Sequence, residues 1–232
     1  GVDADLAMLI ETIAEIPQIE RIRFTTSHPN EMNERLIACF ASVPKLAAQL
    51  HLPVQAGSDR ILMAMKRNYT ALQYKSIIRK LRAANPNLTF TSDFIVGFPG
   101  ETEDDFQQLL DFLQEAQLDR VGCFQYSPVE GAPANKLDGI VPDEVKQERW
   151  ERFMEHQQAI STARLAAKVG REMDVLIDEI DEDGDAVGRS SADAPEIDGN
   201  VFITSEQKLE PGQMVRVRIT DSSEYDLFGE TS

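Results

Sequence analysis

Residues 88–102 read LTFTSDFIVGFPGET, an apolar run that ends in a turn of two glycines, an aromatic residue and a proline. The run 88–96 is typical of a buried strand, and Gly97 to Gly100 end it. Thr102 is followed three residues later by Asp105, which is the spacing of a helix N-cap. A strand, a tight turn and a helix in this order indicate one unit of a parallel α/β sheet.

The same order recurs on both sides of this unit. Strands that alternate with helices predict parallel pairing through right-handed crossovers, and short apolar strands predict helices on one face and a barrel interior on the other. We expect Asn30 to cap one helix and Leu72 to face the core from another. The predicted strands are 19–25, 50–54, 88–96 and 121–126, and the predicted helices are 6–16, 30–40, 58–65, 70–84, one opened by Thr102, and 143–169.

The pattern changes after Gly170. Short apolar runs follow at 173–178, 201–203 and 213–219, and the last alternates with a period of two, which is typical of a half-buried strand. Several short strands separated by turns predict a small β-barrel. The predicted fold class is therefore α/β: a partial parallel barrel over residues 1–168, followed by a small all-β barrel over residues 169–232.

Composition narrows the functional classes. No stretch of about 18 apolar residues is present, so no membrane-spanning helix is predicted. The two cysteines and three histidines have scattered spacings that match no zinc signature, so we predict no metal site. Cys39 and Cys123 are expected to be buried thiols, and no catalytic nucleophile is evident. The chain begins without methionine, which suggests a piece of a longer protein.

Charge is concentrated at the C-terminal end. The net charge is −17, and residues 169–232 hold 17 acidic and 5 basic side chains, a net charge of −12. Such a surface repels a phosphate backbone and attracts a basic partner. General solubility would explain a smaller excess of acid.

Two predicted strand ends carry candidate binding residues, because ligands of parallel α/β sheets bind where the strands end. The first reads PVQAGSDR over residues 53–60. Gln55 can donate and accept hydrogen bonds, the helix N-terminus at Ser58 suits an anion, and Arg60 suits a carboxylate. A helix cap at Ser58 and solvated side chains at Gln55 and Arg60 explain the same residues.

The second strand end reads DFIVGFPGET over residues 93–102. Its rigid turn suits a flat adenine ring, and the lack of a lysine makes a triphosphate a poor fit. An ordinary strand-to-helix turn is the alternative. A third loop, residues 125–132, would close one side of the pocket or lie on the surface. The cofactor-binding candidates at the second end are Asp93, Gly97, Phe98, Pro99 and Gly100.

Two stretches of the first domain resemble the methylthiotransferase branch of the radical S-adenosylmethionine (SAM) enzymes. They read LPVQAGSDRIL over residues 52–62, followed by MKR at 65–67, and SDFIVGFPGET over residues 92–102. The resemblance covers essentially the whole chain, and the C-terminal domain resembles the TRAM domain of this family. It implies SAM as cofactor and a 4Fe–4S cluster held by a Cys-x-x-x-Cys-x-x-Cys loop.

That loop is absent from this sequence, and so is the N-terminal domain that binds a second cluster in the family. The resemblance therefore implies the last four barrel strands plus TRAM, with part of the SAM pocket and with cluster ligands outside this chain. Family chemistry is reductive SAM cleavage to a 5′-deoxyadenosyl radical, hydrogen abstraction and methylthio insertion. We expect the fragment alone to be inactive, and the full-length enzyme to need a reductant protein in the cytoplasm.

Two branches of the family are matched in different places. Residues 21–29, RIRFTTSHP, resemble the MiaB branch, which modifies an isopentenyl-adenosine in tRNA. Residues 118–124, LDRVGCF, 126–132, YSPVEGA, and 192–199, ADAPEIDG, resemble the RimO branch, which modifies an aspartate of the S-twelve protein of the small ribosomal subunit. Residues 224–227, EYDL, also fit the RimO branch.

Electrostatics favours the RimO-type substrate. A TRAM domain that grips tRNA should be basic, whereas an acidic one complements a basic ribosomal protein. The alternatives are a tRNA-modifying enzyme of the MiaB type and a non-catalytic binding module built on a degenerate barrel. The candidate substrate-docking residues are Asp193, Glu196, Asp198 and Tyr225.

Overall fold

The computed structural model describes residues 5–26, 28–181, 185–194 and 198–231. Its contacts divide the chain into two compact units, Gly1–Gln157 (unit 1) and Gln158–Ser232 (unit 2). The division falls within the long helix α6 (Asp143–Ala166). Unit 1 is a parallel α/β sheet and unit 2 is a closed β-barrel, so the predicted architecture is confirmed.

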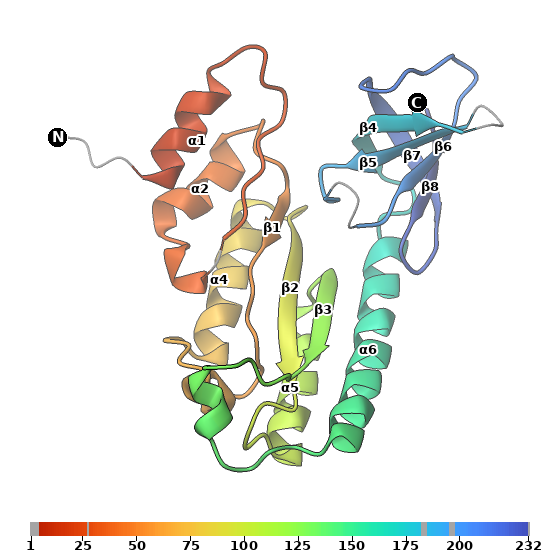
Figure 1. Cartoon of the computed structure of the whole chain (residues 1–232). Coiled ribbons are helices and arrows are strands. Elements are labelled where there is room, and N and C mark those ends of the chain that lie inside the picture. The colour runs from red at the N-terminus through yellow and green to blue at the C-terminus, as the bar shows by residue number, and fades with distance from the viewer. Residues whose placement is uncertain (1–4, 27, 182–184, 195–197, 232) are drawn as a thin grey trace. The chain divides into compact units, whose positions relative to one another are not determined.

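The sheet of unit 1 has three parallel strands in the order β1-β2-β3 (Figure 1). They are β1 (Gln49–His51), β2 (Thr89–Val96) and β3 (Arg120–Gln125). The connecting helices are α1 (Leu6–Ala14), the 3-10 turn η1 (Pro29–Glu31), α2 (Glu34–Ser42), α3 (Asp59–Ala64), α4 (Ala71–Ala84), α5 (Glu103–Ala116), the 3-10 turn η2 (Pro133–Lys136) and α6.

Strand β2 shows why the sheet has two unlike faces. Phe90, Phe94 and Val96 are fully buried, whereas Thr91 and Asp93 on the alternate positions are partly exposed. Successive side chains of a strand point to opposite faces, so one face packs against the helices and the other stays open. The buried face forms an aromatic core with side chains from the helices, in which rings of Tyr74, Phe94, Phe112 and Phe153 pack against one another at centroid distances of 5.3–5.9 Å.

Three local expectations of the sequence are wrong. The predicted strand 19–25 is reduced to two parallel bridges, Ile22 with Leu46 and Thr25 with His51. The segment around Leu46 that could pair with it is short. Helix α2 ends just before it, at Ser42, and Pro44 has no N–H to donate to a strand ladder.

The other two concern helices. Asn33, and not Asn30, caps α2, because the turn η1 takes up the residues before it. Leu72 is 67% exposed. It lies two residues before the buried Tyr74, and a step of two residues turns a helix by about 200°, onto the opposite face.

Unit 2 is a five-stranded closed barrel in the order β4-β5-β6-β8-β7. Its core consists of side chains that alternate along the strands, such as Val175 and Ile177, Val201 and Ile203, and Val217 and Ile219. The sequence pattern missed β5 and β8, whose inward positions include the small residues Gly188 and Gly229. The strands are β4 (Glu172–Ile180), β5 (Ala186–Ser190), β6 (Val201–Thr204), β7 (Met214–Ser222) and β8 (Leu227–Thr231).

Among the described residues, no helix is both long enough and apolar enough to span a membrane.

Candidate functional site

Backbone hydrogen bonds tie the three predicted strand-end loops together. Gln55 N donates to Asp93 O at 3.0 Å, and Ile95 N donates to Gln55 O at 3.0 Å. On the other side of β2, Tyr126 N donates to Val96 O at 2.8 Å. The loops that follow β1, β2 and β3 therefore meet at one edge of the sheet, as their positions in the sequence predict.

Gln55 occupies a conformation that is unusual for its residue type. Its φ is +78°, in the left-handed region that costs most residues about 1–2 kcal/mol. A parallel bridge between Gln55 and Phe94 holds it there. Strained backbone that is held by its surroundings concentrates at ligand sites, and a binding role for Gln55 remains a prediction.

The turn Gly97–Gly100 is shaped by its two glycines. Their φ angles are +73° and +83°. A Cβ on Gly97 would lie 2.3 Å from Cγ of Lys146, a buried residue of α6. Gly100 N donates to Gly139 O at 2.7 Å, which ties the turn to the loop before α6. The predicted turn is present, and the space that a side chain at Gly97 would need is filled by Lys146 of α6.

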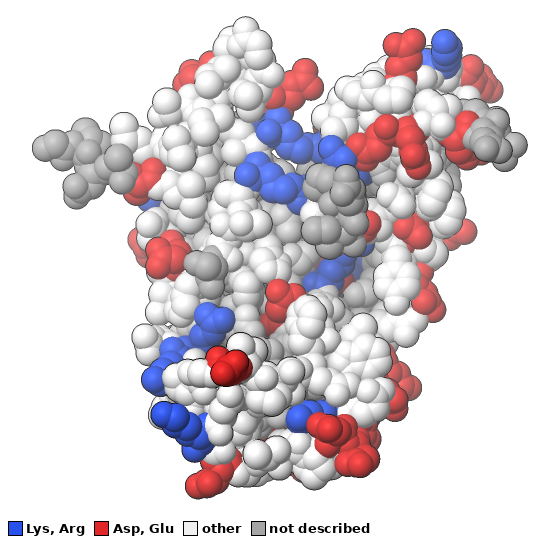
Figure 2. All heavy atoms as spheres, viewed as in Figure 1, with Lys and Arg blue, Asp and Glu red and all other residues white. Residues whose placement is uncertain are grey.

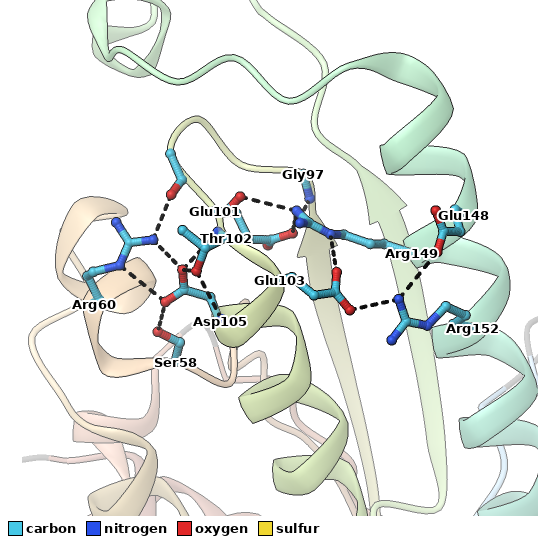
Figure 3. Close-up of polar contacts among 11 residues, drawn as sticks. Ser58, Arg60, Gly97, Glu101, Thr102, Glu103, Asp105, Glu148, Arg149 and Arg152 are labelled. Atoms are coloured by element: carbon cyan, nitrogen blue, oxygen red, sulfur yellow. Dashed lines mark hydrogen bonds and ion pairs between the residues drawn. The ribbon is translucent and has the colours of Figure 1, made fainter.

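A buried ion pair supports this turn from α6 (Figure 3). Arg149 Nη1 lies 2.8 Å from Glu101 Oε1, and the side chains are 6% and 3% exposed. Glu101 Oε1 also accepts a hydrogen bond from Gly97 N at 2.9 Å. Burial raises the pKa of Glu101, and the Gly97 N–H and Arg149 oppose that rise. The sequence analysis identified neither Glu101 nor Arg149 as a site residue.

Asp105 is the centre of a second network, also drawn in Figure 3. Its carboxylate accepts hydrogen bonds from Ser58 Oγ at 2.6 Å and from Arg60 Nε at 3.2 Å. It also accepts from Thr102 N at 2.9 Å and Oγ1 at 2.5 Å, which completes the predicted helix cap. Arg60 Nη2 reaches both this carboxylate and Gly100 O, the latter at 2.6 Å.

These contacts give Ser58 and Arg60 defined partners. Ser58 stands at the N-cap of α3 but makes no side-chain capping bond, because its buried hydroxyl donates to Asp105. Burial raises the pKa of Asp105, but the hydrogen bonds from Arg60, Ser58 and Thr102 outweigh it and hold the pKa well below the ordinary value. In this structure, Ser58 and Arg60 brace the loop after β1 against the turn before α5.

A cavity of about 470 Å³ lies between the starts of α3, α4 and α5. Ser58, Arg60 and Asp105 line it, together with carboxylates of α5 such as Asp111 and Glu115. Gln55 and the turn residues 97–100 are not among its lining residues. The sequence-predicted binding residues are thus divided between this cavity and the edge where the strands end.

A chain of polar contacts crosses the open face of the sheet. Arg23 Nη1 donates to Gln49 Oε1 at 3.0 Å, and Gln49 Nε2 donates to Thr91 Oγ1 at 3.2 Å. The same hydroxyl lies 2.9 Å from His51 Nδ1, and His51 Nε2 lies 3.5 Å from Asp93 Oδ2. This polar row leads toward the strand ends and offers donors and acceptors to a ligand.

The sequence identified only Asp93 of this row. His51 lies on the partly exposed face. The period-two spacing of Thr91 and Asp93 indicates a shared face, but the neighbouring strand's contribution depends on the register of β1 with β2.

Neither cysteine has the character of a nucleophile. Burial raises the pKa of the Cys39 thiol and, more strongly, that of Cys123. Reactive cysteines have a lowered pKa, so both thiols stay protonated at neutral pH. Within the described ranges, no group of three His, Cys, Asp or Glu side chains could hold a metal ion.

The candidate docking residues of unit 2 have different surroundings. Asp193 is 2% exposed, and its carboxylate accepts hydrogen bonds from Ser190 N at 3.1 Å and Oγ at 2.6 Å. Asp198 accepts from Ala194 N at 2.7 Å, and Tyr225 is 59% exposed. Glu196 lies outside the described residues. Docking by these four residues remains a prediction. Asp193 is buried, and of the three residues that the structure describes Tyr225 is the most exposed.

Two known protein families match separate parts of the chain. Residues 2–113 match the radical SAM superfamily, and residues 169–231 match the TRAM domain. Among solved structures, coproporphyrinogen III oxidase (HemN) from Escherichia coli, a radical SAM enzyme, superposes with a TM-score of 0.50 at 13% identity, covering 74% of this chain and 44% of that one. This likeness concerns the fold alone.

Curated relatives are much more similar in sequence. The ribosomal protein uS12 methylthiotransferase RimO of Bordetella pertussis is 61% identical over 224 residues, which cover 96% of this chain and 50% of the relative. RimO of Pseudomonas aeruginosa is 58% identical over 226 residues, with 96% and 50% coverage. The chain spans about half the length of these relatives, and each aligns with residues before and after the Gly97–Gly100 turn.

Proposed function

Because the chain belongs to the radical SAM methylthiotransferase family, we propose that it is the C-terminal part of a RimO-type enzyme that adds a methylthio group to an aspartate of ribosomal protein uS12. The high identity to RimO relatives across both units carries this proposal. A strained, glycine-rich edge at the ends of parallel strands supports it, because ligands bind at that edge in such folds. We propose a domain boundary between residues 168 and 169, beyond the division that the contacts give after Gln157.

SAM is the cofactor that family membership implies. The residues present suit it: Gln55 and the turn Gly97–Gly100 lie at the edge where the strands end, and the polar row ending at Asp93 offers groups for a ribose or an amino acid. Ser58 and Arg60 would act through Asp105 by fixing the loops. The proposed SAM-binding residues are Gln55, Asp93, Gly97, Phe98, Pro99 and Gly100.

The iron–sulfur cluster does not fit this chain. Its two cysteines lie in α2 and β3, both have raised pKa values, and the described residues offer no cluster of metal ligands. We place the ligands of a 4Fe–4S cluster outside this chain. When bound, SAM and the cluster supply the radical chemistry of the family, and the residues described here bind and orient the cofactor. A reductant protein would serve the full-length enzyme in the cytoplasm.

Replacing Gly97 by valine is expected to weaken SAM binding by the full-length protein about tenfold or more. A valine at positive φ would be strained and would clash with Lys146, so the turn should shift from the position that the site needs. A factor of ten in affinity corresponds to roughly 1.4 kcal/mol. Gly212→Val is the matched control, because Gly212 has a φ of +87° and no atom near its missing Cβ. Calorimetric titration with SAM measures both variants, and unchanged affinity of Gly97→Val would remove the turn from the site.

The substrate assignment predicts a preference for a basic protein over RNA. The acidic unit 2 should attract uS12, and this attraction should weaken as salt rises, whereas tRNA phosphates should be repelled. We expect the full-length protein to bind uS12 at least about tenfold more tightly than tRNA, consistent with 1.4 kcal/mol of favourable charge complementarity. Titrations with both partners at two salt concentrations test this. Tighter binding of tRNA would favour a MiaB-type enzyme.

A further inference from the structure

One row of side chains runs around the outside of the barrel through all five strands. The strand register pairs Glu179 of β4 with Val187 of β5, and Val187 with Phe202 of β6. It then pairs Phe202 with Phe228 of β8, and Phe228 with Asp221 of β7. These five residues form a row, called here the aromatic strip, with two phenyl rings within it and a carboxylate at each end. Four of them are exposed, and Val187, between Glu179 and Phe202, is buried.

The two phenyl rings are exposed and stacked on each other. Their centroids are 5.4 Å apart, their planes differ by 19°, and the residues are 36% and 38% exposed. Each follows a fully or nearly fully buried neighbour, Val201 before Phe202 and Leu227 before Phe228, so both rings point outward. They add nothing to the barrel core, which is filled from the inward positions.

The unit that carries the strip is acidic. Unit 2 carries most of the chain's negative charge, and acidic side chains gather on the face of it drawn in Figure 2. Of its five basic residues, Arg189 pairs with Asp178, and Arg216 pairs with Asp174. Exposed aromatic rings framed by carboxylates attract cationic side chains, through the ring faces and through direct ion pairing.

The charge also decides between two classes of partner. Exposed stacked rings on a small β-barrel are a platform for single-stranded nucleic acid when a positive groove follows the phosphates. Here the row ends in Glu179 and Asp221, and the net charge of the unit would repel a phosphate backbone. An arginine- or lysine-rich protein segment has the complementary charge.

We propose that the aromatic strip docks an extended basic segment of the ribosomal protein substrate, with a cationic side chain over the stacked rings and others at the terminal carboxylates. This proposal rests on the proposed function and adds to it the surface that recognises the substrate. The stacked rings form its centre, and aromatic residues at the centre of an interface usually carry most of its binding energy.

The test compares uS12 binding by full-length variants. Phe202→Thr/Phe228→Thr removes both rings but keeps residues that favour strands, and it should weaken binding at least about tenfold. Phe202→Tyr/Phe228→Tyr keeps the rings and should bind nearly as well as the wild type. Leu72→Ala removes a more exposed apolar side chain from α4 in unit 1 and should leave affinity unchanged. Thermal unfolding of each variant confirms that its fold is intact.

A second pair of measurements addresses the charges. Glu179→Gln/Asp221→Asn should reduce the dependence of uS12 affinity on salt while keeping the rings.

If the wild type binds uS12 and the Thr double variant binds equally well, the strip is refuted and the proposed function stands. If the wild type does not bind uS12 at either salt concentration, both fail. If the Thr double variant lost affinity for tRNA and for uS12 by the same factor, the assignment of the strip to a basic protein would also be overturned.

Discussion

Replacing Arg149 by methionine should lower the free energy of unfolding of the chain by about 3–5 kcal/mol, which is the usual cost of removing one partner of a buried ion pair. The substitution leaves the carboxylate of Glu101 buried, with the Gly97 N–H as its remaining donor in this network. Chemical denaturation monitored through Trp150 would measure the loss. The turn Gly97–Gly100 should loosen with it, because Glu101 connects Arg149 to Gly97.

Matched variants separate burial from charge. Arg152 lies one turn further along α6 and pairs with Glu103 at 2.8 Å on the surface, so Arg152→Met should cost less than about 1 kcal/mol. Glu101→Gln combined with Arg149→Met removes both charges and should recover part of the loss. If Arg149→Met and Arg152→Met lowered the free energy of unfolding equally, the buried ion pair would be no more stabilising than the surface pair.

The pH dependence of the Arg149→Met variant has a defined sign. The pKa of Glu101 is raised in the folded state, chiefly by burial, so its burial favours folding at low pH and opposes it as pH rises through the folded pKa. Without Arg149 the pKa should rise further. The stability difference from the wild type should therefore shrink as pH falls from neutral toward the ordinary carboxyl range.

Replacing Asp105 by alanine should lower the free energy of unfolding by about 2–4 kcal/mol, because several donors that are partly or fully buried lose their acceptor at once. Ser58 Oγ, Arg60 and the Thr102 N–H all donate to this carboxylate. Asp104→Ala is the matched control, since Asp104 is an exposed first-turn residue of α5 whose carboxylate accepts from Gln108 Nε2 at 2.9 Å. The control should cost about 0.5 kcal/mol through the helix dipole.

Acid unfolding provides an independent measure of Asp105. Its folded pKa is lowered, so the stability that it contributes is complete above the ordinary carboxyl value of 3.8 and is lost as pH falls below it toward the folded pKa. The difference between the wild type and Asp105→Ala should be constant near neutral pH and should decrease below about pH 4. A difference that persists unchanged at the lowest pH would mean that the carboxylate charge is not responsible.

The sequence alone determined the alternation of strands and helices, the Thr102–Asp105 cap, the change to a β-barrel after Gly170 and the edge of the sheet where candidate ligand residues gather. These features depend on neighbouring residues, whose periodicity and turn chemistry are legible in one chain. The family resemblance placed Gln55 and Gly97 in a single site, and parallel pairing explains why the loops that carry them meet.

Tertiary structure alone decided which distant side chains touch. Arg149 lies 48 residues from Glu101, and Ser58 lies 47 residues from Asp105, so no local pattern joins them. The polar row and the aromatic strip depend on strand register, and a slip of one residue would turn each side chain to the opposite face of its strand. Register is set by packing of the whole sheet or barrel, and that is why neither feature could be read from the order of residues.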